Sequence, residues 1–395
     1  MDIYHTKMRK YEQTHPWLTF SLDLSDASHR IWLALGEAAS KCEHIAGAPL
    51  LPAVWEHLHR IYLTKGVLGT TAIEGNTLTE EEARERIEGR LKLPPSKEYL
   101  GIEIDNIVRA VNLIGERILA GERGDLTVGL IQEYNRITLE GLELAQGISP
   151  GEIRAYPVVV RGTGYEGAPA EDCEFLLQKL CDWLNEPISA DAGDAIVSGL
   201  LKAVLAHIYI AWIHPFGDGN GRIARLVEFQ ILVNAGVPSP AAHLLSNHYN
   251  QTRQEYYRQL AATSRSGGKV LPFIEYALRG FIEGLKEQLQ VIRTQQLAIA
   301  WRDYINWFFH DRQSTGEKRR HNLILEISRA ATPVTLIEMP ELSPQVARAY
   351  ANVTQKTLSR DVNWLLEMDL LERSGEGYRA KLEKVLAFLP ARRSE

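Results

Sequence analysis

The chain has 395 residues, enough for two or three domains, and its apolar share of 45% and charged share of 24% are those of an ordinary globular protein. This composition excludes a fibrous or disordered chain, and the net charge of −6 argues against a protein that binds nucleic acid over its whole surface. The charge is uneven, because residues 312–395 hold 14 lysines and arginines against 11 acidic residues, a net +3 that leaves −9 for the rest. A mildly basic C-terminal module is therefore expected.

Cysteine content and hydropathy indicate the cellular compartment of the protein. Cys42, Cys173 and Cys181 form no metal-binding pattern, and such a sparse, odd set is typical of reduced thiols. The N-terminal segment is polar and lacks the apolar centre of a signal peptide. The most apolar stretch, 200–216, is interrupted by a lysine and a histidine, which favours a buried helix over a membrane span. The sequence thus predicts a soluble, cytoplasmic protein with no membrane segment.

Helical periodicity dominates the chain. A helix over 53–73 is closed by Gly75, and a capping box formed by Thr79 and Glu82 opens the next helix, over 80–91. A Pro-Pro pair then breaks the chain. Further helices are predicted over 99–121, 126–141, 171–185, 193–213, 221–235, 246–264 and 270–310.

Two segments depart from this pattern. Residues 156–161 are β-branched in part, and Gly162-Thr163-Gly164 provides a turn before 165–168, so a short β-hairpin is expected over 156–168. After a polar loop at 310–317, the C-terminal part reads as three helices followed by strand, glycine turn and strand. This order is typical of a winged helix, with 355–367 as the second helix of a helix-turn-helix unit. The predicted ranges are 319–331, 344–352, Thr354 or Thr357 to Met368, and 370–379.

Residues 214–225, His-Pro-Phe-Gly-Asp-Gly-Asn-Gly-Arg-Ile-Ala-Arg, carry the chemistry. Gly219 and Gly221 flank an asparagine just before a helix, so backbone N–H groups and the positive end of the helix dipole are available to a phosphate. Arg222 and Arg225 both project from the first turn, and guanidinium groups suit phosphate oxygens.

The same loop offers a metal ligand and a base. Asp218 supplies a hard oxygen suited to Mg²⁺, and His214 can accept a proton near neutral pH. An ordinary glycine-rich turn would explain any one of these residues. The complete set indicates transfer of a phosphorus-centred group.

At every fixed position this stretch resembles the HxFx(D/E)GNGRxxR motif of the Fic family, and similar residues occur at Ala206-His207 and Pro272-Phe273. The resemblance covers roughly 60–290. It implies an all-α Fic fold with a small β-hairpin flap, to which the C-terminal pattern adds a winged helix-turn-helix domain. The expected domains are an N-terminal helical region 1–110 with an inhibitory helix at about 53–75, a catalytic core 111–285, a linker helix 286–310 and a winged helix 311–395.

The resemblance also implies an activity, the transfer of AMP from ATP to Tyr, Thr or Ser hydroxyls of target proteins, the chain itself included. His214 would take the hydroxyl proton, and Asp218 would hold Mg²⁺ on the α- and β-phosphates. The flap residues Val158, Val159 and Val160 would pair with a target segment through main-chain hydrogen bonds. The expected nucleotide-binding residues are Phe216, Gly217, Asp218, Gly219, Asn220, Gly221, Arg222, Arg225, Tyr256 and Tyr257.

An inhibitory element is expected upstream. Thr70-Thr-Ala-Ile-Glu74-Gly75 resembles the (S/T)xxxE(G/N) inhibitory signature of the family. Thr70 and Glu74 share a helix face, and Glu74 is expected in the last helical turn, where the dipole disfavours a carboxylate unless a cation relieves it. By the resemblance, Glu74 pairs with Arg225 and occupies the place of the γ-phosphate.

Alternatives stay open. Glu74 could position a water that removes AMP from modified proteins, or the Fic core could be the ligand sensor of a DNA-binding regulator. Basic residues near the second helix and wing would favour DNA, and acidic residues on the same surface oppose it. These are Lys356, Arg360, Arg373 and Arg379, against Asp361, Glu367, Glu372 and Glu376.

Donor contacts and assembly are less determined. Thr252 and Gly268-Lys269 depart from the Asn and Gly-Asp that the family often has, which leaves the base and ribose contacts of Tyr256 and Tyr257 open, with core packing as the alternative. His207 is expected to be structural. A homodimer is expected because related proteins often form dimers.

Overall fold

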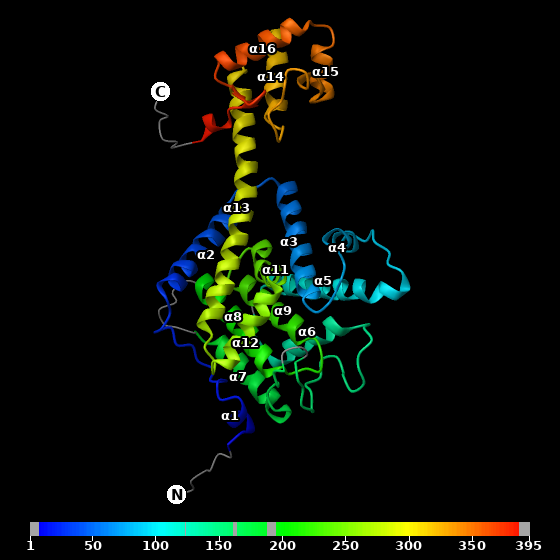
Figure 1. The fold of residues 1–395 in the computed structure, drawn as a ribbon, viewed down its shortest axis with the longest axis vertical. Helices are drawn as coiled ribbons and strands as arrows, with labels where there is room; N and C mark the ends of the chain where they lie inside the picture. Colours follow the sequence, from blue (N-terminus) through cyan, green and yellow to red (C-terminus); the bar gives the residue numbers. More distant parts are fainter. Residues whose placement is uncertain (1–7, 123, 161–163, 188–194, 387–395) are drawn as a thin grey trace. The chain divides into compact units, whose positions relative to one another are not determined.

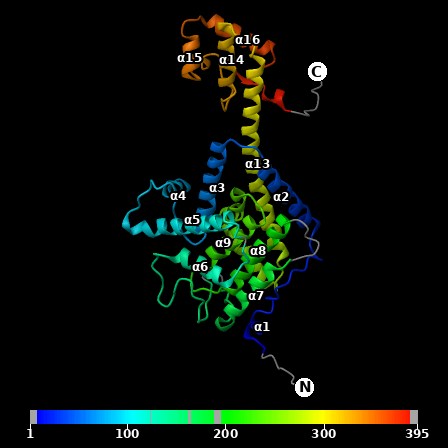
Figure 2. The same cartoon turned by 180° about the vertical axis from the view of Figure 1, so that it is seen from behind.

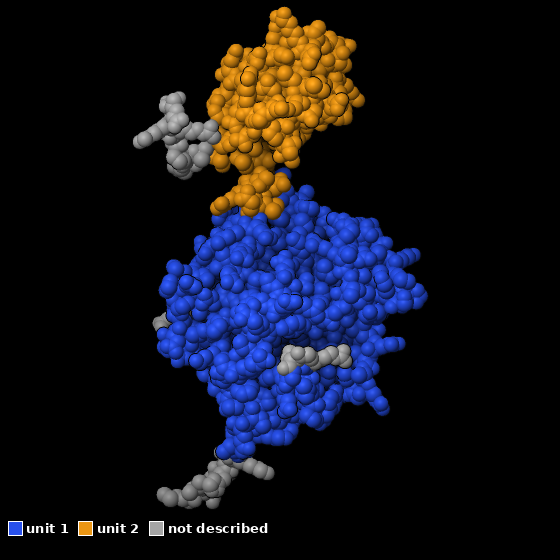
Figure 3. Space-filling model, in the orientation of Figure 1, with its two compact units in different colours: residues 1–289 blue, residues 290–395 orange. Residues whose placement is uncertain are grey.

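The computed structural model describes residues 8–122, 124–160, 164–187 and 195–386. The chain forms two compact units, residues 1–289 and residues 290–395 (Figure 3). The boundary between them lies within a single helix, α13 (Leu271–Phe308). The finer, four-part division expected from the sequence stays a prediction.

The first unit is mainly helical, as the periodicity predicts. Helices α8 and α9 pack side by side at its centre (Figure 1, Figure 2), and the loop between them is the sequence 214–219. The helices are α1 (Lys10–Thr14), α2 (His29–Gly47), α3 (Pro52–Ala72), α4 (Glu80–Ile87), α5 (Glu98–Leu119), α6 (Val128–Leu139), α7 (Cys173–Asn185), α8 (Ala195–Ile213), α9 (Asn220–Asn234), α10 (Ser239–Ala242), α11 (Leu244–Gln251), α12 (Arg253–Arg265) and the start of α13.

Helix α8 explains the apolar stretch of the sequence. It is long and apolar enough to cross a membrane by length and composition, but 78% of its most apolar window is buried inside the first unit. His207, on this helix, is fully buried, and its ring bonds to the Tyr256 hydroxyl at 3.0 Å. The segment is therefore the core helix that the sequence predicts. The two residues before Ala195, where the helix was expected to begin, lie outside the described residues.

Several helix boundaries differ from those expected. The helix predicted over 246–264 is divided into α11 and α12, because the backbone leaves helical geometry at Thr252, where φ is −114° and ψ is 37°. Helix α14 begins at Thr315 rather than 319, since Ser314 and Glu317 form a capping box that the sequence reading placed in a loop. Helices α1 and α2 are not among the predicted elements.

The expected hairpin at 156–168 is only a partial ladder. Val159 and Glu166 form an isolated antiparallel bridge, flanked by hydrogen bonds from Val160 N to Tyr165 O at 2.7 Å and from Gly167 N to Val158 O at 3.1 Å. No regular strand is assigned on either side of the turn in the part of this segment that the structure describes. The predicted turn residues 161–163 lie outside that part.

The second unit has its own apolar core, which includes Trp301, Leu323 and Leu365. Its two strands pair antiparallel with Leu371 opposite Ala380, and an isolated bridge joins Val334 to Tyr378. The order of helices, then hairpin, follows the sequence prediction. The elements are α14 (Thr315–Ile327), α15 (Pro344–Tyr350), α16 (Gln355–Glu367), β1 (Leu371–Ser374) and β2 (Gly377–Ala380).

Candidate active site

The loop between α8 and α9 begins at His214, whose backbone has a positive φ of 51°. Such a conformation is uncommon for a residue with a side chain and needs support from its surroundings. The support comes from Arg154, a buried arginine that donates from Nε to the His214 carbonyl at 2.7 Å and from Nη2 to the Ala168 carbonyl at 2.5 Å. Its Nη1 also bonds the carbonyl of Tyr156 at 2.7 Å. One side chain thus joins the loop to the base of the flap.

Asn220 closes the loop from the other end. Its amide oxygen accepts from Phe216 N at 2.9 Å, and its amide nitrogen donates to Phe216 O at 2.8 Å. Phe216 is 1% exposed and forms a bridge with Ile153, so it packs beneath the loop. Because both ends of the Asn220 amide bond within the loop, this side chain shapes the turn.

Glycines are required here for two different reasons. Gly219 has a φ of 82° as the residue that caps α9, a conformation that glycine adopts at no steric cost. Gly221 has an ordinary φ, but a Cβ on it would overlap Oε1 of Glu74. The Glu74 carboxylate, from the turn that follows α3, therefore lies directly against the first turn of α9, where the helix dipole favours an anion.

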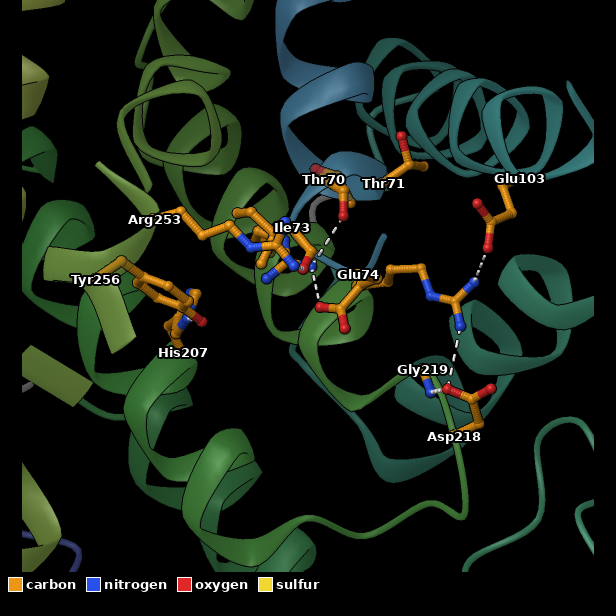
Figure 4. Close-up of polar contacts among 12 residues, drawn as sticks. Thr70, Thr71, Ile73, Glu74, Glu103, His207, Asp218, Gly219, Arg253 and Tyr256 are labelled. Carbon is orange, nitrogen blue, oxygen red and sulfur yellow. Dashed lines mark hydrogen bonds and ion pairs between the residues drawn. The ribbon is translucent and has the colours of Figure 1, made fainter. Parts of the chain in front are cut away.

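Arg222 and Arg225 are both buried, at 4% and 1% exposure. Nη2 of Arg225 donates to Glu74 Oε1 at 2.5 Å and to the carbonyl of Thr70 at 2.9 Å (Figure 4). Nε and Nη1 of Arg225, and Nε of Arg222, have no hydrogen-bond partner among the described residues. Buried donors without partners are costly, so this pair of arginines suits an anion with several oxygens, such as a polyphosphate.

Glu74 lies in a turn rather than in the helix. Helix α3 ends at Ala72, and Glu74 N and Gly75 N bond back to the carbonyls of Thr71 and Ala72 at 3.0 Å. The expected position in the last helical turn is therefore off by two residues, because Gly75, with a φ of 113°, turns the chain away. We call residues 70–76 the inhibitory turn. Burial alone would raise the pKa of the Glu74 carboxyl, but the adjacent Arg225 guanidinium holds that pKa below its usual range.

The His214 imidazole is neutral at pH 7. Burial lowers its pKa to about 4, against the partly opposing influence of the Ala211 backbone. At neutral pH the imidazole therefore carries a free lone pair rather than a positive charge, which is the state a general base requires.

Asp218 is the half-exposed carboxylate of the loop. Its Oδ1 accepts from Gly219 N at 2.5 Å and from Arg222 Nη2 at 3.2 Å (Figure 4). Clusters of three or more possible metal ligands do not occur among the described residues. One carboxylate together with phosphate oxygens and waters is nevertheless the usual setting for Mg²⁺, so Asp218 fits such a role.

Three residues that the sequence reading missed support this loop. Asn135 is fully buried and links Asp218 O to Gly151 N at 2.9 and 2.8 Å. Asn76 donates to Glu103 Oε2 at 2.8 Å, and Glu103 Oε1 lies 3.4 Å from Arg222 Nη1. The ExN spacing of Glu74 and Asn76 was visible in the sequence, but nothing in it pairs Asn76 with a residue 27 positions away.

Tyr256 and Tyr257 lie in different surroundings. Tyr256 is buried, stacks on Tyr249 and bonds His207, so in this structure it belongs to the core. Tyr257 is 37% exposed, and its hydroxyl donates to the carbonyl of Ile73 in the inhibitory turn at 3.1 Å. Their contacts with a nucleotide stay a prediction. In the flap, Val159 is 63% exposed, while Val158 and Val160 are half-buried.

Residues 125–232 match the sequence model of the Fic/DOC family. Protein adenylyltransferase fic-1 of Caenorhabditis briggsae is 28% identical over 231 residues, 58% of this chain and 41% of the relative. Protein adenylyltransferase Fic of Drosophila willistoni is 29% identical over 240 residues, 60% of this chain and 43% of the relative. The chain thus spans about two fifths of the length of the curated relatives it matches.

Solved structures extend the likeness to the fold. A Fic family protein from Desulfovibrio desulfuricans is 21% identical with a TM-score of 0.56, covering 91% of this chain and 98% of that one. Fic-1 of Caenorhabditis elegans is 23% identical, also with a TM-score of 0.56, covering 67% of this chain and 73% of that one. The mainly helical Fic fold expected from the motif is confirmed.

Proposed function

Residues 125–232 match the Fic/DOC family, and on that premise we propose that this chain is a protein adenylyltransferase that moves AMP from ATP to hydroxyl groups of target proteins. The proposal rests on one combination of features. Burial keeps the His214 ring neutral, and Arg222 and Arg225 at the start of α9 have buried N–H groups without hydrogen-bond partners among the described residues. The names of the relatives favour this direction over removal of AMP and over a purely DNA-binding role.

In the proposed reaction, the target hydroxyl gives its proton to the neutral His214 ring as its oxygen attacks the α-phosphorus of ATP. A new O–P bond forms, the bond from the α-phosphorus to the bridging oxygen breaks, and pyrophosphate leaves. Arg222 and Arg225 bind the outer phosphates, and the backbone N–H groups around Gly219 bind near the α-phosphate. The main chain at Val158, Val159 and Val160 aligns the target segment.

Mg²⁺ is part of the proposal. Asp218 would hold it, and the ion would neutralise charge on the phosphates and the leaving pyrophosphate. Arg222 must then leave Asp218, to which it bonds at 3.2 Å, and bind phosphate oxygens instead.

We further propose that the enzyme is autoinhibited by the Glu74–Arg225 ion pair. The carboxylate lies on Gly221 and on Arg225, so the outer phosphates cannot reach the arginine until the inhibitory turn moves. Thr70 contributes through its carbonyl, and Gly75 through the turn.

The test is self-labelling. Glu74→Gly protein incubated with Mg²⁺ and ATP labelled in the α-phosphate should acquire label faster than wild type, whereas label in the γ-phosphate should not be incorporated. Incorporation of the γ-label would indicate phosphorylation. Absence of α-label from the variant, from itself and from proteins of a cell extract, would refute the proposed activity.

For the second unit we propose a winged helix spanning 311–395, joined to a core 111–285 and an N-terminal region 1–110 by a linker helix 286–310. Lys356 and Arg360 are exposed on α16, while Asp361 is buried by pairs with two arginines, which removes one of the acidic residues that oppose DNA binding. A salt-sensitive gel shift with mixed duplex DNA tests this role, and no shift at low salt would exclude it. We also propose a cytoplasmic location, because the three cysteines are sparse and form no metal-binding pattern, and a homodimer, because related proteins often form dimers; sedimentation would measure the assembly.

A further inference from the structure

The inhibitory turn is held by two side chains of α12, Arg253, which belongs to neither the 214–225 motif nor the inhibitory signature, and Tyr257. The carbonyl of Ile73 accepts from Arg253 Nη2 at 2.6 Å (Figure 4) and from the Tyr257 hydroxyl at 3.1 Å. Both donors come from the first turns of α12. The last carbonyls of a helix have no partner within it, and the negative end of the helix dipole attracts a cation, so the end of α3 is a favourable place for an arginine.

We propose that Arg253, assisted by Tyr257, is the positioning residue of the inhibitory turn. Ile73 immediately precedes Glu74, and a hydrogen bond to its carbonyl fixes the peptide plane from which the Glu74 side chain projects. Beyond Glu74, Gly75 adopts a φ of 113°, and before it the Ile73 side chain is buried at 1% exposure, so the bonds to the Ile73 carbonyl set the orientation of the peptide that leads to Glu74. The inference rests on the proposed autoinhibition, because it names what keeps Glu74 on Arg225.

The far end of the turn is anchored separately. Asn76 donates to the carbonyl of Leu100 at 2.9 Å and accepts from Leu78 N at 3.0 Å, which fixes the chain where it leaves the turn. Glu74 thus lies between an anchor on α5 and an anchor on α12. The anchor on α12 is the more exposed of the two, since Arg253 and Tyr257 both face solvent while Asn76 is buried.

Arg253 also links inhibition to nucleotide entry. Its guanidinium carbon lies 5.9 Å from the centre of the Tyr257 ring, and Tyr257 is one of the predicted nucleotide-binding residues. A nucleotide that binds Tyr257 breaks the hydrogen bond from the Tyr257 hydroxyl to the Ile73 carbonyl, one of the two bonds that this carbonyl accepts from α12. Binding of the donor and release of the inhibitory turn are then coupled through the same carbonyl.

The test compares Arg253→Ala with Arg258→Ala, a matched control five residues further along α12. The Arg258 side chain is 72% exposed, and its ion pair within the described part of the chain is with Glu255 on its own helix. In otherwise wild-type protein, Arg253→Ala should raise the initial rate of self-labelling from α-labelled ATP by about three- to tenfold, as expected for loss of one partly solvent-exposed hydrogen bond, with Arg258→Ala near wild type. In a Glu74→Gly background, Arg253→Ala should add no further increase, and Arg253→Lys should be intermediate in wild type.

Equal rates for the two single variants would overturn the proposal. So would a loss of rate on adding Arg253→Ala to Glu74→Gly, because that result would make Arg253 a nucleotide contact. Amide hydrogen exchange of peptides covering 70–80 provides a readout that needs no catalysis. Faster exchange in Arg253→Ala than in Arg258→Ala supports the anchor even if Glu74→Gly transfers nothing, and unchanged exchange refutes it.

Discussion

Each unit of the protein has a cluster in which arginine meets a carboxylate, and the two clusters are bonded to different degrees. In the second unit, Asp361 is 3% exposed and accepts from Arg319 at 2.7 Å, from Arg320 at 2.9 Å and from the Tyr350 hydroxyl at 3.0 Å. In the first unit, Arg225 is just as buried, but only its Nη2 is bonded among the described residues. A buried carboxylate whose oxygens are all hydrogen-bonded stabilises the fold, whereas a buried arginine with unbonded N–H groups is available to bind a ligand.

The largest effect should come from the base in the unsaturated region. His214→Ala in the Glu74→Gly background should lower the rate of AMP transfer by about 10³-fold, the range typical of losing general-base catalysis. Initial rates of self-labelling measure this, with the exposed His310→Ala as control. The unfolding midpoint should hardly change. A variant that keeps a tenth or more of the rate would remove His214 from the reaction.

The next effect should come from the saturated cluster. Asp361→Ala leaves Arg319 and Arg320 without their shared acceptor and should destabilise the second unit by about 3 kcal/mol. Chemical denaturation followed through the tryptophans would report it. Asp303→Ala, which removes an exposed partner of Arg302, serves as control and should cost less than about 0.5 kcal/mol. Equal losses of unfolding free energy in the two variants would show that the Asp361 cluster does not stabilise the second unit more than an exposed ion pair does.

Glu74→Gly should affect stability less than Asp361→Ala. The substitution leaves the buried Arg225 without its counterion, but the Glu74 side chain is 33% exposed and solvent screens the pair, so the loss should be about 1–2 kcal/mol in the free energy of unfolding of the first unit. A cost near 3 kcal/mol would instead make Glu74 a structural residue of the same kind as Asp361.

The smallest effect concerns pH. Because the pKa of Glu74 is lowered in the folded protein, its ion pair is complete above the ordinary pKa of a carboxyl and is lost only as pH falls through the lowered value. The ratio of Glu74→Gly to wild-type rates should therefore stay constant, within about twofold, from pH 8 to pH 5.5. A ratio that declines towards one in this range would show that protonation of Glu74 releases the inhibition.

The sequence was most informative where the functional residues are contiguous. In 214–225, spacing alone places a base, a turn and two arginines at one helix start, and the inhibitory signature was recognisable for the same reason. Arg154, Asn135 and Glu103 support that loop from distant positions, and only packing brings them there. The break at Thr252 was missed because a change of backbone dihedrals at one residue leaves the hydrophobic periodicity on both sides unchanged.

The Glu74–Arg225 contact also has a genetic consequence. The loop at 214–219 is already closed by Asn220 and Arg154, and Glu74 is the side chain that occupies Arg225 in the resting arrangement. Codons for glutamate and glycine differ at a single base. Under the proposed function, every copy of this gene is one point mutation away from an unregulated enzyme, and cells that carry it need either a tolerant target or a means of reversing the modification.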